Sequence, residues 1–522
     1  MPGRPGRVPT AVLLGLWAAQ AGCTVTLQVP ELHEPTVPVA QTKDRGQLKV
    51  HMRSGELLVL DEWKVSPDGD RLRGTGQAYT VTREPKGGQE RQDVAVADVA
   101  VLETTSSKSM FSPGMGVMAT TTVILGSLTV ACVASPKSCF GSCPTFYVGG
   151  AGSGPGEPER PQAEGFSASI ASVLEARDLD ALGLARPGGS RVDITMRNEA
   201  LETHAVRRVR LLAAPRPAGG RVLAGIDDRL YPTPALVPPL ACRAPEGDCL
   251  EALGADDGRD RASSADPSDL ATREEIELLF PAAHGRSGVA IAARQTLLST
   301  FLFYQSMAYF GRGAGEYLAA LERGGPAAGR RAMGMARLLG GVEVEVAEGE
   351  SPWRAIGSFD EPGPIAGDVR VVPFEATGGG ALHVRLRLAK GHWRLGSVGL
   401  ARLGEPVAPV AIEAESVEHG GGLDEDARRR LQGGDGHLVT HPGDAYRFVF
   451  LLPPSAAPLE LFLESEGYYY EWMRQEWLAD EDPEMAALVL ADPAEALRRL
   501  APVYKAHESR LEREFWASRF RE

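Results

Sequence analysis

The sequence predicts a β-rich α+β protein with a small N-terminal antiparallel β-barrel or sandwich. A β-sandwich-like body with a buried helix and C-terminal helices is expected to follow. Three observations support this fold class. Apolar residues alternate with polar ones in many short segments, and 60 Gly and 38 Pro in 522 residues supply frequent turns. One segment near residue 300 is apolar over most of its helical circumference, and helix-forming residues dominate the end of the chain.

Composition narrows the class of protein further. A length of 522 residues suggests three or four domains, and a hydrophobic share of 43% is ample for packed cores. The net charge of −14 argues against a nucleic-acid binder held by phosphate contacts. Six of the eight Lys lie before residue 138, so the first quarter of the chain differs from the rest.

Residues 1–23 have the features of an export signal. Arg4 and Arg7 form a positive region, and a short apolar stretch from Val8 to Ala19 precedes Cys23. This arrangement resembles the lipobox of bacterial lipoproteins, in which the cysteine after a small residue receives the lipid. Gln20 departs from the aliphatic residue usual at that place, so an ordinary secretory signal or an uncleaved anchor is the alternative. We therefore expect a lipoprotein-type signal peptide at 1–23, with Cys23 as the lipid attachment site.

Residues 24–108 are expected to form the small β-barrel-like domain. Apolar residues recur at every second position on both sides of a Ser54-Gly55 turn and of an Asp68-Gly69-Asp70 turn. The order of strands and turns resembles small SH3-like or Sm-like barrels. A structural module is the interpretation we favour, and no RNA-binding role is carried over.

Residues 109–136 form an apolar segment. No charged residue occurs between Lys108 and Lys137, and Met115–Val133 is nearly long enough for a membrane helix. A transmembrane helix and a buried or interfacial segment are both compatible with this pattern. If Cys23 is lipidated outside the cytoplasm, one crossing would place the rest of the chain inside, which conflicts with disulfides there.

Residues 137–166 are predicted to be a Cys-, Gly- and Pro-rich linker. An exported chain favours disulfides, and short loops would be closed by Cys139–Cys143 and by Cys242–Cys249. Cys132 would then be left over. The spacings and the lack of nearby His make zinc a poor alternative. No metal and no cofactor is predicted.

Residues 167–340 are expected to form a β-sandwich-like region with helices. Apolar spacing predicts an amphipathic helix over 167–182 and a hairpin-like pair of strands around Ile194 and over His204–Leu212. His204 is expected to be a partly exposed strand histidine. A buried helix follows from Gln295 and is interrupted at Gly311 and Gly313, before a second helix over 314–322.

A second β-rich region is expected over 341–455, and a helical region over 456–522. In the first, the turn Lys390-Gly391 is predicted to join a strand to its partner over 392–403, and a last hairpin turns at Pro442-Gly443-Asp444. In the second, the segment from Gly467 to Asp480 is predicted to be helical. Aromatic residues concentrate there. They either clamp the helices onto the sandwich or form a platform facing carbohydrate or membrane, with these candidates: Tyr468, Tyr469, Trp472 and Trp477.

The sequence contains no recognised catalytic motif. The G-x-S-x-G, H-E-x-x-H, P-loop and G-x-G-x-x-G patterns are missing, and the acidic loop around Gly258 lacks the register of a calcium loop. His437 and His441 fall in a predicted strand and turn, which does not suit a helical metal pair. Catalytic residues are therefore unknown. The enzyme hypothesis that we retain is an envelope hydrolase of glycans or esters that uses carboxylates on the β-rich body.

Several segments together resemble a family of uncharacterised bacterial lipoprotein-like envelope proteins. They are the lipobox-like start and the runs KSCFGSCPTFY, ALETHAVRRVRLLAAP, QTLLSTFLFYQSMAYFG and LFLESEGYYYEWMRQEW. The resemblance implies a membrane-anchored location in the bacterial envelope, mostly periplasmic or surface-facing, and implies no activity. We expect a non-catalytic binding or scaffolding role towards a protein, polysaccharide or lipid partner, with the membrane reached through the lipid anchor.

Overall fold

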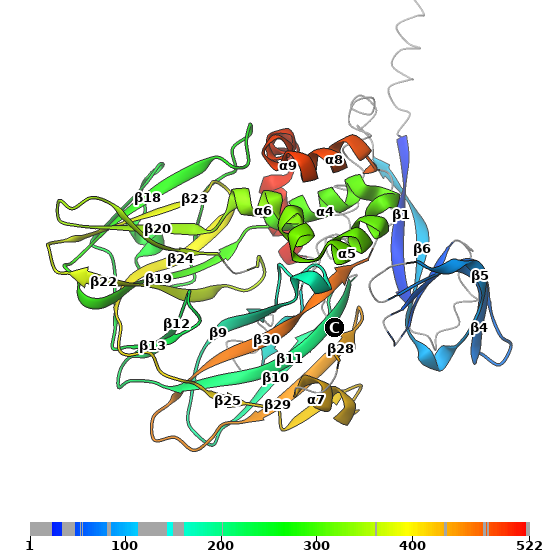
Figure 1. Cartoon of the computed structure of the whole chain (residues 1–522), viewed down its shortest axis with the longest axis horizontal. Coiled ribbons are helices and arrows are strands. Elements are labelled where there is room, and N and C mark those ends of the chain that lie inside the picture. Colours follow the sequence, from blue (N-terminus) through cyan, green and yellow to red (C-terminus); the bar gives the residue numbers. More distant parts are fainter. Residues whose placement is uncertain are drawn as a thin grey trace, which may run out of the picture.

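The β-rich α+β architecture is confirmed in the computed structural model, whose described residues form five sheets and a group of helices (Figure 1). It describes these residues: 23–33, 47–52, 54, 56–80, 85–112, 143–149, 161–200, 202–360, 363–432, 436–472, 477 and 480–517. Residues 1–22 of the predicted signal peptide 1–23 and the apolar run Met115–Val133 lie outside them. In the part that is described, no helix combines the length and the apolarity that crossing a membrane requires.

Sheet A contains the N-terminal strands, and the order of its members is β1-β6-β2-β3-β4-β5. The pairs β2–β3, β3–β4 and β4–β5 are antiparallel neighbours in sequence, so the alternation around short turns does give hairpins here. The sheet is open along this path, with β1 and β5 at its two edges. Its strands are β1 (Cys23–His33), β2 (Leu48–Met52), β3 (Leu57–Val65), β4 (Arg71–Tyr79), β5 (Pro85–Ala95) and β6 (Val99–Ser112).

Sheets B and C form the first sandwich of the body. Apolar side chains from both sheets share one core, in which Phe146, Ile194 and Phe448 of sheet B meet Val209 and Leu461 of sheet C. Sheet B contains β27 (Gly422–Leu423), β26 (Ser416–His419), β29 (Ala445–Leu451), β10 (Arg191–Arg197), β7 (Thr145–Val148) and β8 (Ala163–Glu164). Sheet C contains β25 (Val410–Ile412), β11 (Glu202–Pro215), β30 (Leu459–Glu471) and β9 (Ala176–Arg186), with β28 (Leu438–Thr440) paired to β11.

Sheets D and E form the second sandwich. Their shared core includes Val289 and Val372 of sheet D and Ile276, Val344 and Leu386 of sheet E. Sheet D contains β13 (Leu230–Thr233), β12 (Arg221–Gly225), β22 (Asp368–Thr377), β19 (His284–Gln295), β24 (Trp393–Arg402) and β14 (Leu236–Val237), with β17 (Arg261–Ala262) paired to β24. Sheet E contains β16 (Gly247–Asp248), β15 (Ala241–Ala244), β18 (Arg273–Phe280), β23 (Leu382–Ala389), β20 (Val342–Glu348) and β21 (Arg354–Phe359).

The two sandwiches are nested in the chain. The second sandwich uses residues 221–403, whereas the first takes its strands from both sides of that stretch, before 216 and after 409. The boundary expected between 340 and 341 does not separate two sheets, because β18 before it and β20 after it both pair with β23. Local patterning could not show this, since the strand pairs that close the first sandwich are formed by segments far apart in sequence.

Three expected hairpins are corners between opposite sheets. The strands flanking Lys390-Gly391, β23 and β24, belong to sheets E and D, and β10 and β11 belong to sheets B and C. The strands on either side of Pro442-Gly443-Asp444, β28 and β29, are likewise in sheets C and B. The strand positions are correct and the pairing is wrong. An alternating pattern marks the buried face of a strand, but it does not identify the neighbouring strand.

Helices α4, α5, α6, α8 and α9 gather on one side of the molecule, next to both sandwiches, whereas α7 lies beside β26 and β28 (Figure 1). Their core joins Leu302 and Met307 with Leu497 and Leu500, and Tyr470 of sheet C packs into it. The expected break at Gly311 and Gly313 is a short 3-10 turn (Gly311–Gly313), after which α5 runs beyond the predicted end. The α-helices are α3 (Leu250–Leu253), α4 (Leu298–Phe310), α5 (Ala314–Ala332), α6 (Gly334–Leu339), α7 (Glu425–Leu431), α8 (Pro483–Ala491) and α9 (Pro493–Ala517).

Two segments expected to be helical are strands. Residues 176–186 form β9, which pairs with β30, and only Ser172–Leu174 forms a short 3-10 turn. Residues 467–471 continue β30, which pairs with β11. The aromatic run there is apolar at every position because the strand is covered on both faces. Tyr468 and Tyr470 pack against the helices, and Tyr469 packs into the sandwich core.

Candidate functional site

Of the predicted cysteine sites, one disulfide is present in the structure, and the other cysteine predictions are not tested by it. Cys242 and Cys249 form a disulfide with an S–S distance of 2.00 Å, which confirms that pair. Cys143 is buried, whereas Cys139 lies outside the described residues, so their pairing stays a prediction. Cys23 is the first residue of β1, and its lipidation also stays a prediction.

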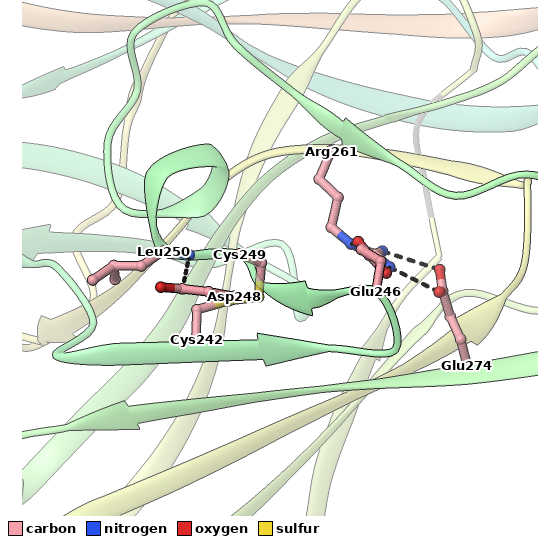
Figure 2. The surroundings of a disulfide bond; sticks show 7 residues. All are labelled: Cys242, Glu246, Asp248, Cys249, Leu250, Arg261 and Glu274. Atoms are coloured by element: carbon pink, nitrogen blue, oxygen red, sulfur yellow. Dashed lines mark hydrogen bonds and ion pairs between the residues drawn. A yellow bond between two sulfur atoms is a disulfide. The ribbon is translucent and has the colours of Figure 1, made fainter.

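The disulfide closes a short hairpin at the edge of sheet E (Figure 2). The buried Arg261 guanidinium lies between two carboxylates, at 2.6 Å from Glu246 and 2.8 Å from Glu274. At the same turn, the Asp248 carboxylate accepts a hydrogen bond from the Leu250 amide at the start of α3. The disulfide and the buried ion pair therefore fix the same hairpin, which gives this cysteine pair a structural role.

The four candidate platform aromatics are all buried. Tyr468 is 7% exposed, Tyr469 6%, Trp472 2% and Trp477 0%, so none of them presents its ring to solvent. Trp472 stacks on His51 of sheet A with ring centroids 3.2 Å apart and donates a hydrogen bond to Thr203. These side chains pack sheet A, sheet C and the helices together. They therefore match the hypothesis of an aromatic clamp and not that of a platform facing carbohydrate or membrane.

The histidines expected in strands are more deeply placed than the sequence suggested. His204 is fully buried rather than partly exposed, and its Nε2 lies 2.7 Å from the Glu202 carboxylate. His437 and His441 flank β28, as the predicted strand and turn require. His437 Nε2 lies 2.8 Å from Glu175, so these two histidines do not converge on one ligand site.

A cavity of about 550 Å³ lies between the helices and the two sandwiches. Its deep wall includes Tyr304 and Tyr469, and its exposed rim includes Arg337 and Asp360. Most of its lining is apolar, and it contains these methionines and aromatics: Phe303, Met307, Phe310, Tyr317, Met333 and Met335. A volume of this size lies within the roughly 300–1,000 Å³ of typical small-molecule sites.

The helix that forms one wall of the cavity is positioned by its N-terminal end. Thr296 Oγ1 accepts a hydrogen bond from the Leu298 amide and donates one to the Gly391 carbonyl, so the start of α4 is tied to the β23–β24 corner. Gly391 has a φ of +76°, and a Cβ there would lie 2.5 Å from the Ala265 backbone nitrogen. The corner therefore requires glycine, and it places the next residue, His392, in the cavity wall.

Glu164 contributes a buried carboxyl group to the cavity wall. It accepts a hydrogen bond from the Ile365 amide at 2.7 Å and lies against Gly363, where a Cβ would come within 2.4 Å of its carboxyl carbon. Burial is the main cause that raises the pKa of Glu164 to about 7, and the nearby Asp178 carboxylate raises it further. This carboxyl group therefore holds the loop beside the cavity and changes its charge near neutral pH.

His392 is the other titratable group deep in the wall. Its side chain is 3% exposed, and burial together with the positive charge of Arg273 lowers its pKa to about 3. The imidazole is therefore neutral at physiological pH. Its Nδ1 is buried and has no hydrogen-bond partner within the described part of the chain.

The two tyrosine hydroxyls of the deep wall already have partners. Tyr469 donates a hydrogen bond to the Ser167 carbonyl at 3.0 Å, and Tyr304 donates one to the buried Glu471 carboxylate at 3.3 Å. Burial also raises the pKa of Tyr469 well above its usual value, so it stays protonated. These hydroxyls fix the shape of the wall, which makes the cavity preformed.

The sequence indicated neither polar residue of the wall as a site. Glu164 fell within a predicted linker, and His392 followed a predicted turn between paired strands. Their approach to one cavity depends on which sheets pair and on where the helices pack, and single-sequence patterns do not encode that. The largely apolar circumference of α4 was the available signal, because such a helix needs covering on most sides.

Comparisons with known proteins add no family. No family model matches the sequence, and the curated proteins include no significant match. Among solved structures, the chain is similar to one in the structure of the infectious bursal disease virus Gx strain. That likeness covers 95% of this chain and 91% of the other, with 9% identity and a TM-score of 0.12, and supports no inference about fold or function.

Proposed function

We propose that this chain is a non-catalytic, membrane-anchored protein of the bacterial envelope that holds a small apolar, lipid-like ligand in its cavity. The observation that carries the proposal is the preformed cavity of about 550 Å³ with its Met- and Phe-rich lining. Methionine side chains adapt their shape to apolar ligands, and aromatic rings offer large contact areas. A lipid-like ligand also suits a protein that is expected at a membrane surface.

The binding experiment uses the full chain and N-phenyl-1-naphthylamine, a dye whose fluorescence rises in apolar surroundings. Saturable binding is expected in the wild type. Ala332→Trp adds an indole at the cavity lining and should weaken dye binding at least tenfold. Ala320→Trp, at an exposed position outside the cavity lining, is the matched control and should bind as the wild type does.

Two outcomes of the dye-binding experiment would contradict this proposal. If the wild type does not bind the dye, or if the two tryptophan variants bind it equally well, the cavity is not the binding site. Circular dichroism of each variant shows whether the fold is retained.

The envelope location is tested at the lipobox-like start. Metabolic labelling with a fatty-acid analogue, followed by membrane fractionation, should label the wild type and the Thr24→Ala control. Cys23→Ser should lose both the label and the membrane association. Retention of both in Cys23→Ser would overturn the lipoprotein part of the proposal and leave the cavity part intact.

The hydrolase alternative has one specific observation in its favour. A carboxyl group whose pKa is near 7, as that of Glu164 is, suits a general acid or base. Against it, the Glu164 carboxyl already accepts a backbone hydrogen bond from Ile365. Hydrolysis of a p-nitrophenyl ester that is abolished by Glu164→Gln would favour the enzyme over the binding protein.

A further inference from the structure

We infer that the cavity binds amphiphiles with a zwitterionic head group, whose two opposite charges lie beside Arg337 and Asp360 at the cavity rim. The inference rests on the proposed binding function and names the chemical class of its ligand. An alkylphosphocholine or a lysophosphatidylethanolamine represents that class. Amphiphiles with a single charge, such as an alkyl sulfate or an alkyltrimethylammonium, do not.

The exposed part of the cavity lining carries the inference. The lining residues that are exposed are Ala168, Ala336, Arg337 and Asp360. The last two are charged, and their charges are opposite. Within the described part of the chain neither side chain forms an ion pair, and the Asp360 carboxylate accepts a hydrogen bond from the Ser358 hydroxyl at 2.7 Å. Both charges can therefore be reached by the head group of a ligand.

The backbone at the end of α6 brings these two charges to one rim. Arg337 lies in α6, Gly340 follows the last residue of that helix, and Gly341 comes next; all three line the cavity. A Cβ at Gly341 would lie 2.2 Å from Asp360 Oδ1, so the missing side chain leaves the space that the carboxylate occupies. The Asp360 carboxylate is therefore held against the same turn that follows the helix of Arg337.

The interior of the cavity favours a tail rather than a head group. His392 is neutral, mainly because burial lowers its pKa to about 3, and burial raises the pKa of Tyr469, so its hydroxyl stays protonated. The Glu164 carboxyl already accepts a hydrogen bond from the Ile365 amide. Moving an unpaired charge from water into such surroundings costs free energy. The tail therefore occupies the apolar interior, and a charged head group stays at the rim.

Two opposite charges at one rim favour a zwitterion over an ion. Arg337 attracts an anionic head group and Asp360 repels it, and for a cationic head group the two effects are exchanged. A zwitterion can place its anionic group beside the guanidinium and its cationic group beside the carboxylate, so that both contacts are attractive. Water screens charges at an exposed rim, so each contact is worth at most about fivefold in affinity.

Competition binding on the full chain, at low ionic strength and below micelle-forming concentrations, tests the inference. Four competitors with the same ten-carbon tail displace N-phenyl-1-naphthylamine: decylphosphocholine, decyl sulfate, decyltrimethylammonium and 1-decanol. In the wild type, we expect decylphosphocholine to bind about fivefold more tightly than either singly charged competitor. 1-Decanol is the uncharged reference for the state of the cavity.

The variants remove one charge at a time. In Arg337→Gln, decyltrimethylammonium should bind more tightly than decyl sulfate, and in Asp360→Asn the order should be reversed, because a single charge then remains at the rim. Affinity for 1-decanol should stay at the wild-type value in both variants, which shows that the cavity is intact. Arg331→Gln, at an exposed position outside the cavity lining, is the matched control and should keep the wild-type order.

The outcomes separate this inference from the function on which it rests. If the dye and all four competitors fail to bind the wild type, the proposed function is wrong. If they bind, but a singly charged competitor binds the wild type as tightly as decylphosphocholine, the head-group inference alone is wrong. It is also wrong if decyl sulfate and decyltrimethylammonium keep the same order in Arg337→Gln and in Asp360→Asn.

Discussion

Two regions of the molecule contain clusters of Arg and acidic side chains, yet their surroundings differ. At the junction of the two sandwiches, Arg370 lies 2.5 Å from Asp368 and also donates to the Leu179 carbonyl. Asp178 lies buried beside them, and its pKa is raised to about 6 by burial, despite the opposing effect of Arg370. On sheet E, by contrast, the corresponding side chains form an exposed ladder, in which Arg387 lies 3.2 Å from Glu275 and is 41% exposed.

Ion pairs at the junction and on the ladder therefore contribute differently to the free energy of unfolding. On the ladder, water already solvates each charge, so one exposed pair is worth at most about 1 kcal/mol. At the junction, removing one partner leaves other charges buried and uncompensated. The Asp178 carboxylate at the junction also accepts hydrogen bonds from the Phe166 and Leu179 amides.

The largest effect is expected from Arg370→Met. The change leaves Asp178 and Asp368 buried without their cation, so the free energy of unfolding should fall by about 3–5 kcal/mol. Urea unfolding followed by circular dichroism measures it. A loss below about 1 kcal/mol would abolish the distinction between the two regions.

Glu164 extends the comparison from the junction to the cavity. The native carboxyl keeps its proton up to a pKa of about 7, whereas the unfolded one releases it near 4.5. Between these values the native state binds more protons, so stability should fall as pH rises from about 4.5 to 7, by up to about 3 kcal/mol. Glu164→Gln should lack this part of the slope, as unfolding measured at several pH values would show. Parallel curves for the two proteins would contradict the assignment.

The disulfide tests a covalent constraint in the sheet that bears the ladder. Replacing both Cys242 and Cys249 by Ser should lower the free energy of unfolding by about 2 kcal/mol, because the unfolded chain loses a small closed loop. A reducing agent should destabilise the wild type by a similar amount and leave the double variant unchanged. Equal sensitivity of both proteins to the reducing agent would show that another bond is responsible.

The smallest effect is expected on the ladder itself. Arg387→Met removes an exposed partner of Glu275 and Glu343, so the free energy of unfolding should change by less than about 1 kcal/mol. It is also the matched control for Arg370→Met. A loss as large as that of Arg370→Met would mean that the ladder, although exposed, acts as a single cooperative network.

Much of the local structure could be predicted, and the site could not. The β-rich class, the buried helix after Gln295 and the Cys242–Cys249 pair follow from local pattern, spacing and turn residues. The cavity depends on Glu164, in a predicted linker, and on His392, more than two hundred residues away in the chain. Its formation required long-range packing that no local pattern specifies.

The sequence by itself determined where the chain turns and where many of the strands lie, although β9 and the end of β30 were expected to be helical. The tertiary structure decided which strands pair. The turns at Lys390-Gly391 and at Pro442-Gly443-Asp444 each carry the chain from one sheet to the opposite one, although each reads as a hairpin. The physical reason is that an alternating strand needs a buried face and a hydrogen-bonded neighbour. Its own residues specify the face, and the rest of the chain supplies the neighbour.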